Sequence, residues 1–371
     1  MANATEVRIG LDGVIVAETR LSLVDGERGR LVVRGHDVEA LARTRRFEDV
    51  AALLWAGALP SARESAALAR ELGAARVAAF ARMPALREAL SARDGMEALR
   101  AAAASLREEP GESVHALRVR LTGAIAVFAA AWSRLRAGNA PIAPDASIPH
   151  AADFLRCVRG APSNPAEIAA LDAYLVTVAE HGMNASTFTA RVVASTGSDA
   201  ISAVVAAIGA LKGPLHGGAP GPVLDMLDGI GSPENAEAWL RAELDAGKRL
   251  MGLGHRVYRV RDPRAAVLER AVGALEASGG TSRYLARARA VERVAVRVLR
   301  ERYPTRSLDV NVEFYTAVLL DSLGFAREAF SPIFAVGRVA GWLAHVDEER
   351  ERGRLIRPDV RYVGALPAEA A

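Results

Sequence analysis

Short runs of β-branched and apolar residues near the N-terminus predict a small β element. Residues 14–17 (Val-Ile-Val-Ala) and 31–33 (Leu-Val-Val) are such runs, and the turn signal Asp25 and Gly26 stands between them. Apolar runs on both sides of a turn are typical of strands. Residues 14–34 are therefore predicted to form short strands.

After residue 35 the apolar positions recur at the spacing of an amphipathic helix. Val50, Leu53 and Leu54 form one such stripe, which stops at Gly57, and a glycine at this place is typical of a helix end. The same pattern predicts further helices at 61–73, 94–107, 113–136, 147–159, 165–180, 185–195, 198–212, 222–229, 233–246, 262–276, 283–302, 311–323 and 331–349.

The pattern predicts an all-α fold with a short N-terminal β element. Hydrophobic residues make up 51% of the chain and aromatic residues only 5%, a balance that favours closely packed helices over a β-sandwich. The Gly- and Pro-rich stretch at 213–222 is the best candidate for a hinge.

Charge and cysteine content narrow the class of protein. The net charge of +3 comes from 47 Lys and Arg against 44 Asp and Glu, and no basic run is interleaved with aromatics, so a nucleic-acid partner is not expected. The longest uncharged apolar stretches, around 121–133 and 200–211, are shorter than the roughly 20 residues that span a bilayer. Cys157 is the only cysteine, which rules out an intrachain disulfide and predicts a buried structural thiol. A cytoplasmic protein without membrane contact is expected.

The histidines are the first candidates for chemistry. They are His36, His115, His150, His181, His216, His255 and His345. No pair has the His-x-x-x-His spacing of a helical zinc site, so no metal centre is predicted. His181, His216 and His255 stand beside glycines, which let backbone approach a ligand closely. A histidine at a helix end is nevertheless more often a cap or a surface residue.

Two further segments each allow a structural and a functional interpretation. The Gly-rich segment at 213–220 lacks the features of a Walker loop or a dinucleotide fingerprint, so it is either a plain interhelical loop or a ligand loop. The arginines near His255 form either a solvated basic face or a site for a polyanionic ligand such as a nucleotide phosphate. They are Arg249, Arg256, Arg259, Arg261 and Arg264.

Glu313 stands among apolar neighbours near a predicted helix start, in Asn-Val-Glu-Phe-Tyr at 311–315. Burial there would raise the pKa of the carboxyl group, as a general base requires, while a helix N-terminus would oppose that rise. The alternative is that Glu313 only complements the helix dipole. Spacing alone leaves both possibilities open.

Taken in order, these segments resemble the citrate synthase family along nearly the whole chain. The resemblance rests on the hairpin at 13–35, His-Gly-Met-Asn-Ala-Ser-Thr at 181–187, Leu-Lys-Gly-Pro-Leu-His-Gly-Gly-Ala at 211–219, Gly-Leu-Gly-His-Arg-Val-Tyr-Arg-Val-Arg-Asp-Pro-Arg at 252–264, Asn-Val-Glu-Phe-Tyr at 311–315 and Phe-Ala-Val-Gly-Arg-Val-Ala-Gly-Trp-Leu-Ala-His at 334–345. It implies a large helical domain, 1–218 and 325–371, with the oxaloacetate site and the dimer interface. The small helical domain, 219–324, would carry coenzyme A and the catalytic base and close over the substrate.

The family's reaction is the condensation of acetyl-CoA with oxaloacetate, followed by hydrolysis of the thioester to citrate and CoA. The resemblance thus implies an acyltransferase of the tricarboxylic acid cycle without a cofactor, in which the coenzyme A thioester is a co-substrate. His216 would donate a hydrogen bond to the enol oxygen, and His255 would polarise and protonate the oxaloacetate carbonyl. Glu313 would stand where the base belongs.

The resemblance also implies binding residues and a homodimer. Oxaloacetate would be held by His181, Asn184, Arg264, Phe334, Arg338 and Arg357. Coenzyme A would be held by Leu253, Gly254, Arg256 and Arg259. Arg357 would be donated across the dimer interface, and guanidinium groups suit this task because they bind a carboxylate with two bonds at a time.

Three departures from the family's pattern surround the site. The usual catalytic acid is Asp, whereas Glu313 is one methylene longer; Ala-Pro-Gly-Pro follows Gly218; and Gly182 follows His181, where an acid is frequent. Two alternatives therefore stay open. One is a 2-methylcitrate synthase that uses propionyl-CoA, and the other is a weakly active or non-catalytic homologue that binds oxaloacetate or CoA.

Overall fold

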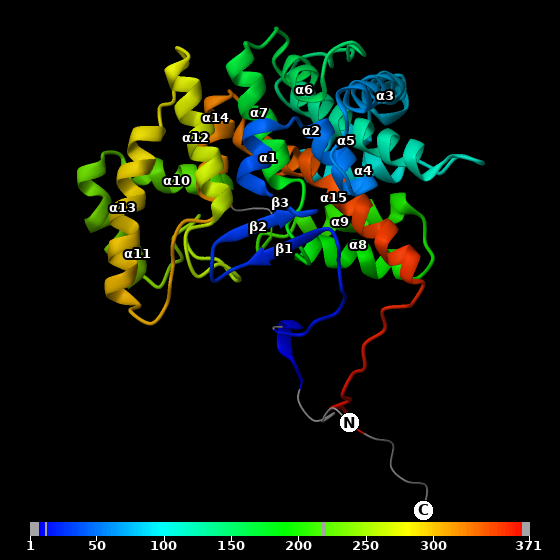
Figure 1. Cartoon of the computed structure of the whole chain (residues 1–371). Coiled ribbons are helices and arrows are strands. Elements are labelled where there is room, and N and C mark those ends of the chain that lie inside the picture. The colour runs from blue at the N-terminus through cyan, green and yellow to red at the C-terminus, as the bar shows by residue number, and fades with distance from the viewer. Residues whose placement is uncertain (1–6, 12, 217–219, 366–371) are drawn as a thin grey trace, which may run out of the picture.

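The computed structural model describes residues 7–11, 13–216 and 220–365 of the chain. Over these residues it is mostly helical, with one small sheet near the N-terminus (Figure 1). The strands are β1 (Ser22–Asp25), β2 (Arg30–Val33) and β3 (His36–Asp37). The α-helices are α1 (Val38–Thr44), α2 (Phe47–Ala56), α3 (Ala62–Phe80), α4 (Gly95–Ala104), α5 (Val114–Arg136), α6 (His150–Arg159), α7 (Pro165–Val178), α8 (Ala185–Ser195), α9 (Ala200–Leu211), α10 (Pro220–Ile230), α11 (Ala236–Asp245), α12 (Pro263–Ala277), α13 (Leu285–Arg302), α14 (Val312–Ser322) and α15 (Phe330–Arg352). Short 3₁₀ turns occupy Ile9–Leu11, Met83–Leu86, Ala89–Ser91, Pro233–Asn235 and Arg327–Ala329. The predicted fold class is confirmed.

The small sheet is an antiparallel arrangement in the order β1-β2-β3. Ser22 pairs with Val33 and Asp25 with Arg30, so the turn lies where Asp25 and Gly26 predicted it. The strand predicted at 14–17 is wrong: this segment is extended but pairs with no strand among the described residues, and Ile15 is 88% exposed. Strand β1 lies further along instead, because Leu21 beside it is buried and secures the sheet to the core.

The helix boundaries follow from local capping chemistry. Ser61 and Glu64 form a capping box at the start of α3, and Asn164 and Glu167 form another at α7, which satisfies N–H groups that the first turn leaves free. Helix α2 ends at Gly57 in the left-handed conformation, with φ 83°, as the sequence predicted.

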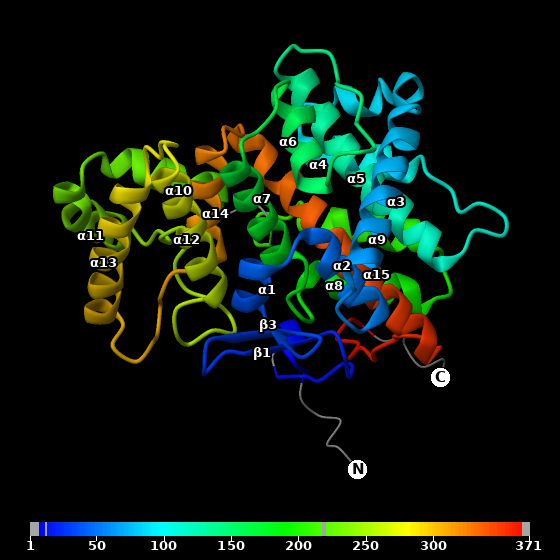
Figure 2. The same cartoon turned by 45° about the horizontal axis from the view of Figure 1, so that its top comes forward.

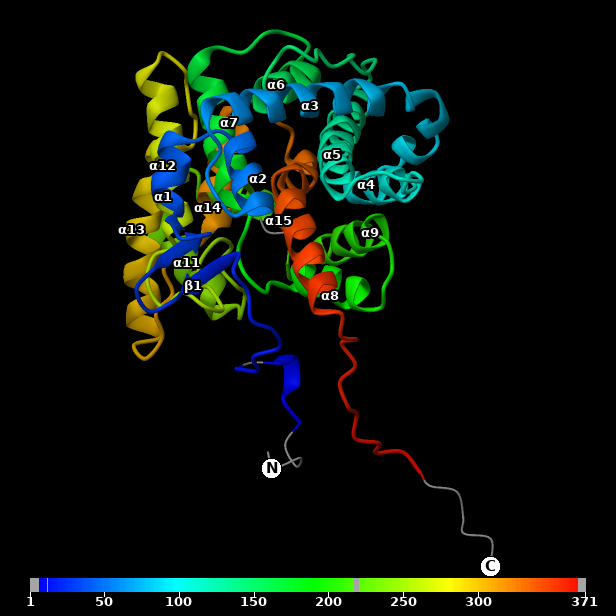
Figure 3. The same ribbon diagram turned by 45° about the vertical axis from the view of Figure 1, so that its right-hand side comes forward.

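Helix α15 runs through the middle of the molecule and packs against α2, α5, α7, α8 and α9 (Figure 3). Its close approach to α7 depends on glycine, because a Cβ at Gly341 would lie 2.1 Å from the carbonyl oxygen of Ala179. A Cβ at Gly337 would lie 2.5 Å from the side chain of Val178. These two contacts place Arg338 of α15 directly beside the end of α7.

Helices α10, α11 and α13 gather at one side of the molecule (Figures 1 and 2). Helix α12 packs both on α14 and on α7, so it joins this side to the rest of the protein. The predicted division into 1–218 with 325–371 and 219–324 stays a prediction, and its boundary at 218 and 219 lies outside the described residues.

Two helical segments are long and apolar enough to cross a membrane by length and composition, Val114–Arg136 and Arg327–Arg352. Their most apolar windows are 72% and 89% buried within the protein, as expected of core helices. Cys157 is buried as well, which confirms the predicted structural thiol.

Candidate active site

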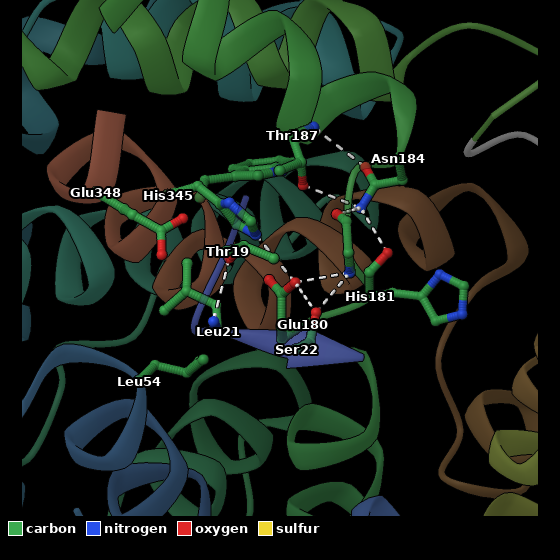
Figure 4. Close-up of polar contacts among 12 residues, drawn as sticks. Thr19, Leu21, Ser22, Leu54, Glu180, His181, Asn184, Thr187, His345 and Glu348 are labelled. Atoms are coloured by element: carbon green, nitrogen blue, oxygen red, sulfur yellow. Dashed lines mark hydrogen bonds and ion pairs between the residues drawn. The ribbon is translucent and has the colours of Figure 1, made fainter. Parts of the chain in front are cut away.

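His181 lies in the short loop between α7 and α8, and its ring points away from the body of that loop (Figure 4). Its Nε2 atom lies 3.2 Å from the hydroxyl of Tyr258. Its ring meets that of His255 edge to face, with centroids 5.5 Å apart. Burial, together with the nearby charges of Arg264 and Arg338, holds the pKa of His181 well below its ordinary value. His181 is therefore a neutral imidazole.

His255 stands in the loop before α12, and the backbone of its own loop fixes its tautomer. The N–H groups of Val257 and Tyr258 both donate to Nδ1, each over 3.0 Å. Nδ1 is thus an acceptor, and the proton of the neutral ring belongs on Nε2. Burial, and then the charge of Arg264, lower the pKa of His255 to about 4. The ring presents an N–H donor to a substrate oxygen.

His216 follows α9 and lies against the start of α8. Its Nε2 atom is 2.8 Å from the hydroxyl of Ser186, which also accepts a hydrogen bond from the indole of Trp342 over 3.1 Å. Burial and the charge of Arg338 lower the pKa of His216 to about 4. The neutral state of His216 therefore follows from burial and a neighbouring cation. Gly217, Gly218 and Ala219, the rest of its motif, lie outside the described residues.

Arg264 and Arg338 bring two buried guanidinium groups to these histidines. Arg264 forms a two-bond pair with Asp262, with Nε 3.0 Å from Oδ1 and Nη2 2.8 Å from Oδ2. Arg338 donates from Nε to the carbonyl oxygen of Val178 and stacks over the ring of Phe334, 4.6 Å from its centroid. It has no carboxylate within ion-pair distance among the described residues. Burial lowers the pKa of Arg338 to about 10, so it stays charged at neutral pH.

Glu313 occupies the first turn of α14, whose N-cap is Asn311. Burial raises the pKa of Glu313 to about 7, although the charge of Arg264 opposes the rise. Its side chain has no hydrogen bond or ion pair to another described residue. Of the two possibilities that the sequence left open, the structure favours a carboxyl group prepared for proton transfer near neutral pH.

The His255 loop and the start of α14 are joined by backbone hydrogen bonds. Gly254 N donates to Asp309 O over 2.8 Å, and Asn311 N donates to Gly252 O over 2.9 Å. Asp262 completes the connection, because its Oδ2 atom accepts from the N–H of Val312 over 3.1 Å while it also binds Arg264. The geometry of His255 and that of Glu313 are therefore linked.

The structure brings together the six residues His181, His216, His255, Arg264, Glu313 and Arg338. Sequence reasoning missed three residues that touch them, Ser186, Tyr258 and Asp262, and a fourth, Trp342, that touches Ser186. The Asp-Pro-Arg order at 262–264 was a usable signal, since Asp before Pro is typical of a helix N-cap. The roles of Ser186 and Trp342 had no local signal, because they arise from contacts between α8, α15 and the His216 loop.

The remaining residues predicted to bind oxaloacetate are Asn184, Phe334 and Arg357, and each lies in a different setting. Asn184 is the N-cap of α8, and its side chain bonds the N–H of Thr187 over 3.1 Å. Phe334 packs under Arg338. Arg357 lies in the exposed arm after α15, and the structure does not join it to the other site residues within one chain. Substrate contacts of these residues stay predictions.

The predicted coenzyme A residues lie along the His255 loop. Leu253 forms a bridge with Val310, and Gly254 adopts φ 80° beside the side chain of Leu308. Arg256 and Arg259 are exposed, and Arg256 also donates to Gly10 O over 3.2 Å. Within the described parts of the chain, no group of three His, Cys, Asp or Glu residues is arranged to hold a metal ion.

This arrangement suits a small dianionic substrate and proton transfer to carbon or oxygen. Buried guanidinium groups bind carboxylates strongly. Neutral imidazoles donate hydrogen bonds to developing negative charge on oxygen, and a carboxyl group with a pKa of about 7 can act as the base.

Comparison with known proteins places the chain in a family. The family model described as citrate synthase, C-terminal domain, matches residues 10–359. The citrate synthase of Haloferax volcanii is 39% identical over 375 residues, which cover 97% of this chain and 96% of the relative. The citrate synthase of Deinococcus radiodurans is 37% identical over 363 residues, 96% of this chain and 95% of the relative.

Solved structures give the same result. The citrate synthase of Thermotoga maritima superposes with a TM-score of 0.86 at 34% identity, covering 99% of this chain and 98% of that chain. The citrate synthase of Thermoplasma acidophilum, solved in a ternary complex with carboxymethyl coenzyme A and oxaloacetate, has a TM-score of 0.88 at 28% identity, with coverage of 99% and 98%. From the hairpin near its N-terminus to the arm that follows α15, the chain belongs to the citrate synthase family.

Proposed function

We propose that this protein condenses acetyl-CoA with oxaloacetate and hydrolyses the resulting thioester to citrate and CoA. The observation that carries the proposal is the convergence of three neutral imidazoles on two buried, charged guanidinium groups, Arg264 and Arg338, of which Arg338 has no carboxylate within ion-pair distance among the described residues. A small dicarboxylate supplies the missing negative charge. The curated relatives at 37% and 39% identity that are named citrate synthase support the same reaction.

In the proposed reaction, Glu313, His216 and His255 each carry one chemical role. Glu313 takes a proton from the methyl group of acetyl-CoA, and His216 donates a hydrogen bond to the enol oxygen that forms. The enol carbon attacks the keto carbon of oxaloacetate, which forms the carbon–carbon bond. His255 gives its Nε2 proton to the oxygen of that carbonyl. Water then cleaves the thioester, and CoA leaves as the thiol.

Arg264, Arg338 and His181 hold the carboxylates of oxaloacetate in this scheme. Arg264 keeps its Asp262 partner over 2.8 Å, so its charge is partly neutralised, whereas Arg338 has only the more distant charge of Glu180 to oppose its own. Leu253, Gly254, Arg256 and Arg259 line the coenzyme A side on the family's pattern. The acyl group ends as an alkyl group in citrate, and closure of the small domain over oxaloacetate excludes water during the condensation.

The homodimer, the donation of Arg357 and a cytoplasmic location are part of the same proposal. The segments before β1 and after α15 extend from the same side of the protein (Figures 1 and 3). They expose apolar side chains, with Ile15 88%, Val360 92% and Val363 88% exposed. A second copy of the chain would bury these arms and bring Arg357 to the partner's site.

The test is release of free thiol from acetyl-CoA and, separately, from propionyl-CoA in the presence of oxaloacetate. We expect faster release from acetyl-CoA, and faster release from propionyl-CoA would make the protein a 2-methylcitrate synthase. Folded protein, verified by a melting transition that oxaloacetate shifts upward, with no release from either donor would refute catalysis. Light scattering that shows an active monomer would refute the shared site.

A further inference from the structure

The N-terminal hairpin of β1 and β2 contacts two of the three loops that carry neutral histidines, those of His181 and His255. One contact is made by Ser22 of β1 and the other by Gly26 in the turn. We propose that this hairpin is a positioning element of the active site, which fixes the His181 loop through Ser22 and the His255 loop through Gly26. The inference deepens the proposed function, on which it rests for its kinetic readout.

Ser22 holds the His181 loop on both sides of the histidine. Its hydroxyl donates to Glu180 Oε1 over 2.8 Å and accepts from the N–H of Gly182 over 3.1 Å (Figure 4). Gly182 N also donates to Glu180 Oε1 over 2.6 Å. The two residues that flank His181 are thereby tied to one strand, while the imidazole projects to the opposite side.

Glu180, which accepts from the Ser22 hydroxyl, belongs to a buried network of charged and polar side chains. Glu180 Oε1 lies 3.0 Å from His345 Nε2, and His345 Nδ1 lies 2.9 Å from Arg191 Nη1. Arg191 pairs with Glu348, which also accepts the N–H of Arg20 over 2.8 Å. The hairpin at Ser22 and the segment just before it at Arg20 therefore both join the same network. A buried network with so many mutual bonds has few alternative arrangements.

The turn of the hairpin holds the His255 loop by close backbone contact. Gly26 O accepts the N–H of Arg259 over 2.9 Å. A Cβ at Gly26 would lie only 2.2 Å from Val257 O and 2.8 Å from the carbonyl carbon of Val257. Val257 N is one of the two donors that fix His255 Nδ1. The turn therefore packs directly against Val257, whose N–H helps to fix the tautomer and orientation of the His255 ring.

The opposite face of the hairpin offers matched controls. Leu23, next to Ser22, is 60% exposed, and Glu27, next to Gly26, is exposed. Gly26 is not among the described residues with positive φ. Alanine at position 26 therefore tests the close approach and not backbone strain.

The decisive experiment compares Gly26→Ala with Glu27→Ala. A displacement of His255 by about 1 Å costs about a hundredfold in rate, so kcat should fall by about 10- to 100-fold in Gly26→Ala and stay unchanged in Glu27→Ala. Nitrogen NMR of ring-labelled histidine, with His255→Gln to assign the signal, should show a changed Nδ1 shift for His255 in Gly26→Ala alone.

This spectrum needs no turnover, so it tests the inference even if the wild type releases no thiol and the proposed function fails. A folded Gly26→Ala protein whose His255 shifts equal those of the wild type would overturn the inference, whether or not kcat falls.

Ser22→Ala tests the contact between the hairpin and the His181 loop. It can be measured even if Gly26→Ala does not fold. Loss of one net hydrogen bond is worth about fivefold, so the KM for oxaloacetate should rise about fivefold with little change in kcat. Leu23→Ala should leave both constants unchanged, and Ser22→Thr, which keeps the hydroxyl, should restore the KM. Equal KM values in Ser22→Ala and wild type would overturn the contact with His181.

Discussion

Two buried arginines on neighbouring helices, Arg191 of α8 and Arg338 of α15, differ in whether a carboxylate of the same chain pairs with them. Arg191 is fully buried and pairs with Glu348 over 2.7 Å and with Glu349 over 2.6 Å. Arg76 follows the same rule with Asp153 at 2.8 Å. These guanidinium groups are neutralised from within the protein.

Arg338 is equally buried but has no carboxylate within ion-pair distance in the described part of the chain. A buried charge without a partner costs free energy. The chain tolerates that cost beside the neutral His181 and His216, where a ligand carboxylate would remove it. The difference teaches that an unpaired buried charge marks a binding site more reliably than burial or charge alone.

The largest expected effect comes from Arg338→Gln. Loss of a buried, charge-assisted contact of about 3–5 kcal/mol should lower kcat/KM for oxaloacetate by a factor between about 10² and a few thousand. The melting temperature should fall only slightly, because no internal ion pair is broken and a single hydrogen bond, to Val178 O, is lost. Thiol-release kinetics and a thermal melt check both parts, and a strongly destabilised variant would show that Arg338 is structural.

Arg191→Gln is the matched variant on the other side of the comparison. It leaves Glu348 and Glu349 buried without their cation, which should cost about 3–5 kcal/mol of unfolding free energy. Urea unfolding measures this loss. A stable variant with wild-type unfolding would remove the distinction between the two arginines.

The carboxyl groups repeat the contrast, since Glu348 is paired and Glu313 is not. Glu313→Asp shortens the base by one methylene, and a shift of about 1 Å should lower kcat by about a hundredfold if the site is built around the longer acid. The KM for oxaloacetate should change little. An increase in kcat would instead mean that the glutamate is a handicap.

The smallest expected effects are in the pH dependence of folding stability, to which Glu313 and Glu348 contribute with opposite signs. Burial raises the pKa of Glu313 to about 7 from an ordinary 4.5. Between these values the folded state keeps a proton that the unfolded state has released, so this group makes stability fall as pH rises from 4.5 to 7. Burial is the largest single influence on Glu348 and would raise its pKa, but the hydrogen bonds from Arg191, Arg20 and Thr19 together lower it. The contribution of Glu348 to stability is therefore lost as pH falls below 4.5.

Glu313→Gln isolates the first of these signs. Unfolding free energy measured against pH should lose its fall between pH 4.5 and 7 in this variant. In the wild type, kcat should rise with pH and level off above about pH 7, where Glu313 is ionised. A kcat that is flat from pH 5 to 8 would contradict the assignment of Glu313 as the base.

Much of the fold could be predicted because its signals are local. The stop at Gly57 and the helical stripes depend on a few neighbouring residues. The strand at 14–17 was wrong because β-branched residues alone do not supply a pairing partner, while Leu21 and Leu31, both buried, decide where the sheet lies.

The site could likewise be predicted only in part from local sequence. His216, His255 and Glu313 could be located through motifs, but the unpaired state of Arg338 could not, because it depends on the approach of α15 to α7 at Gly337 and Gly341. The raised pKa of Glu313 likewise depends on burial by distant segments. Sequence indicates which groups are present, and packing decides which of them are left for a ligand.

Calorimetric titration of oxaloacetate into wild type and Arg338→Gln tests the central claim most directly. The wild type should bind, and affinity should fall in the variant by a factor between about 10² and a few thousand, the equivalent of a lost buried ion pair of about 3–5 kcal/mol. Equal affinity in the two proteins would contradict the claim, because the unpaired guanidinium would then not be the group that receives the substrate.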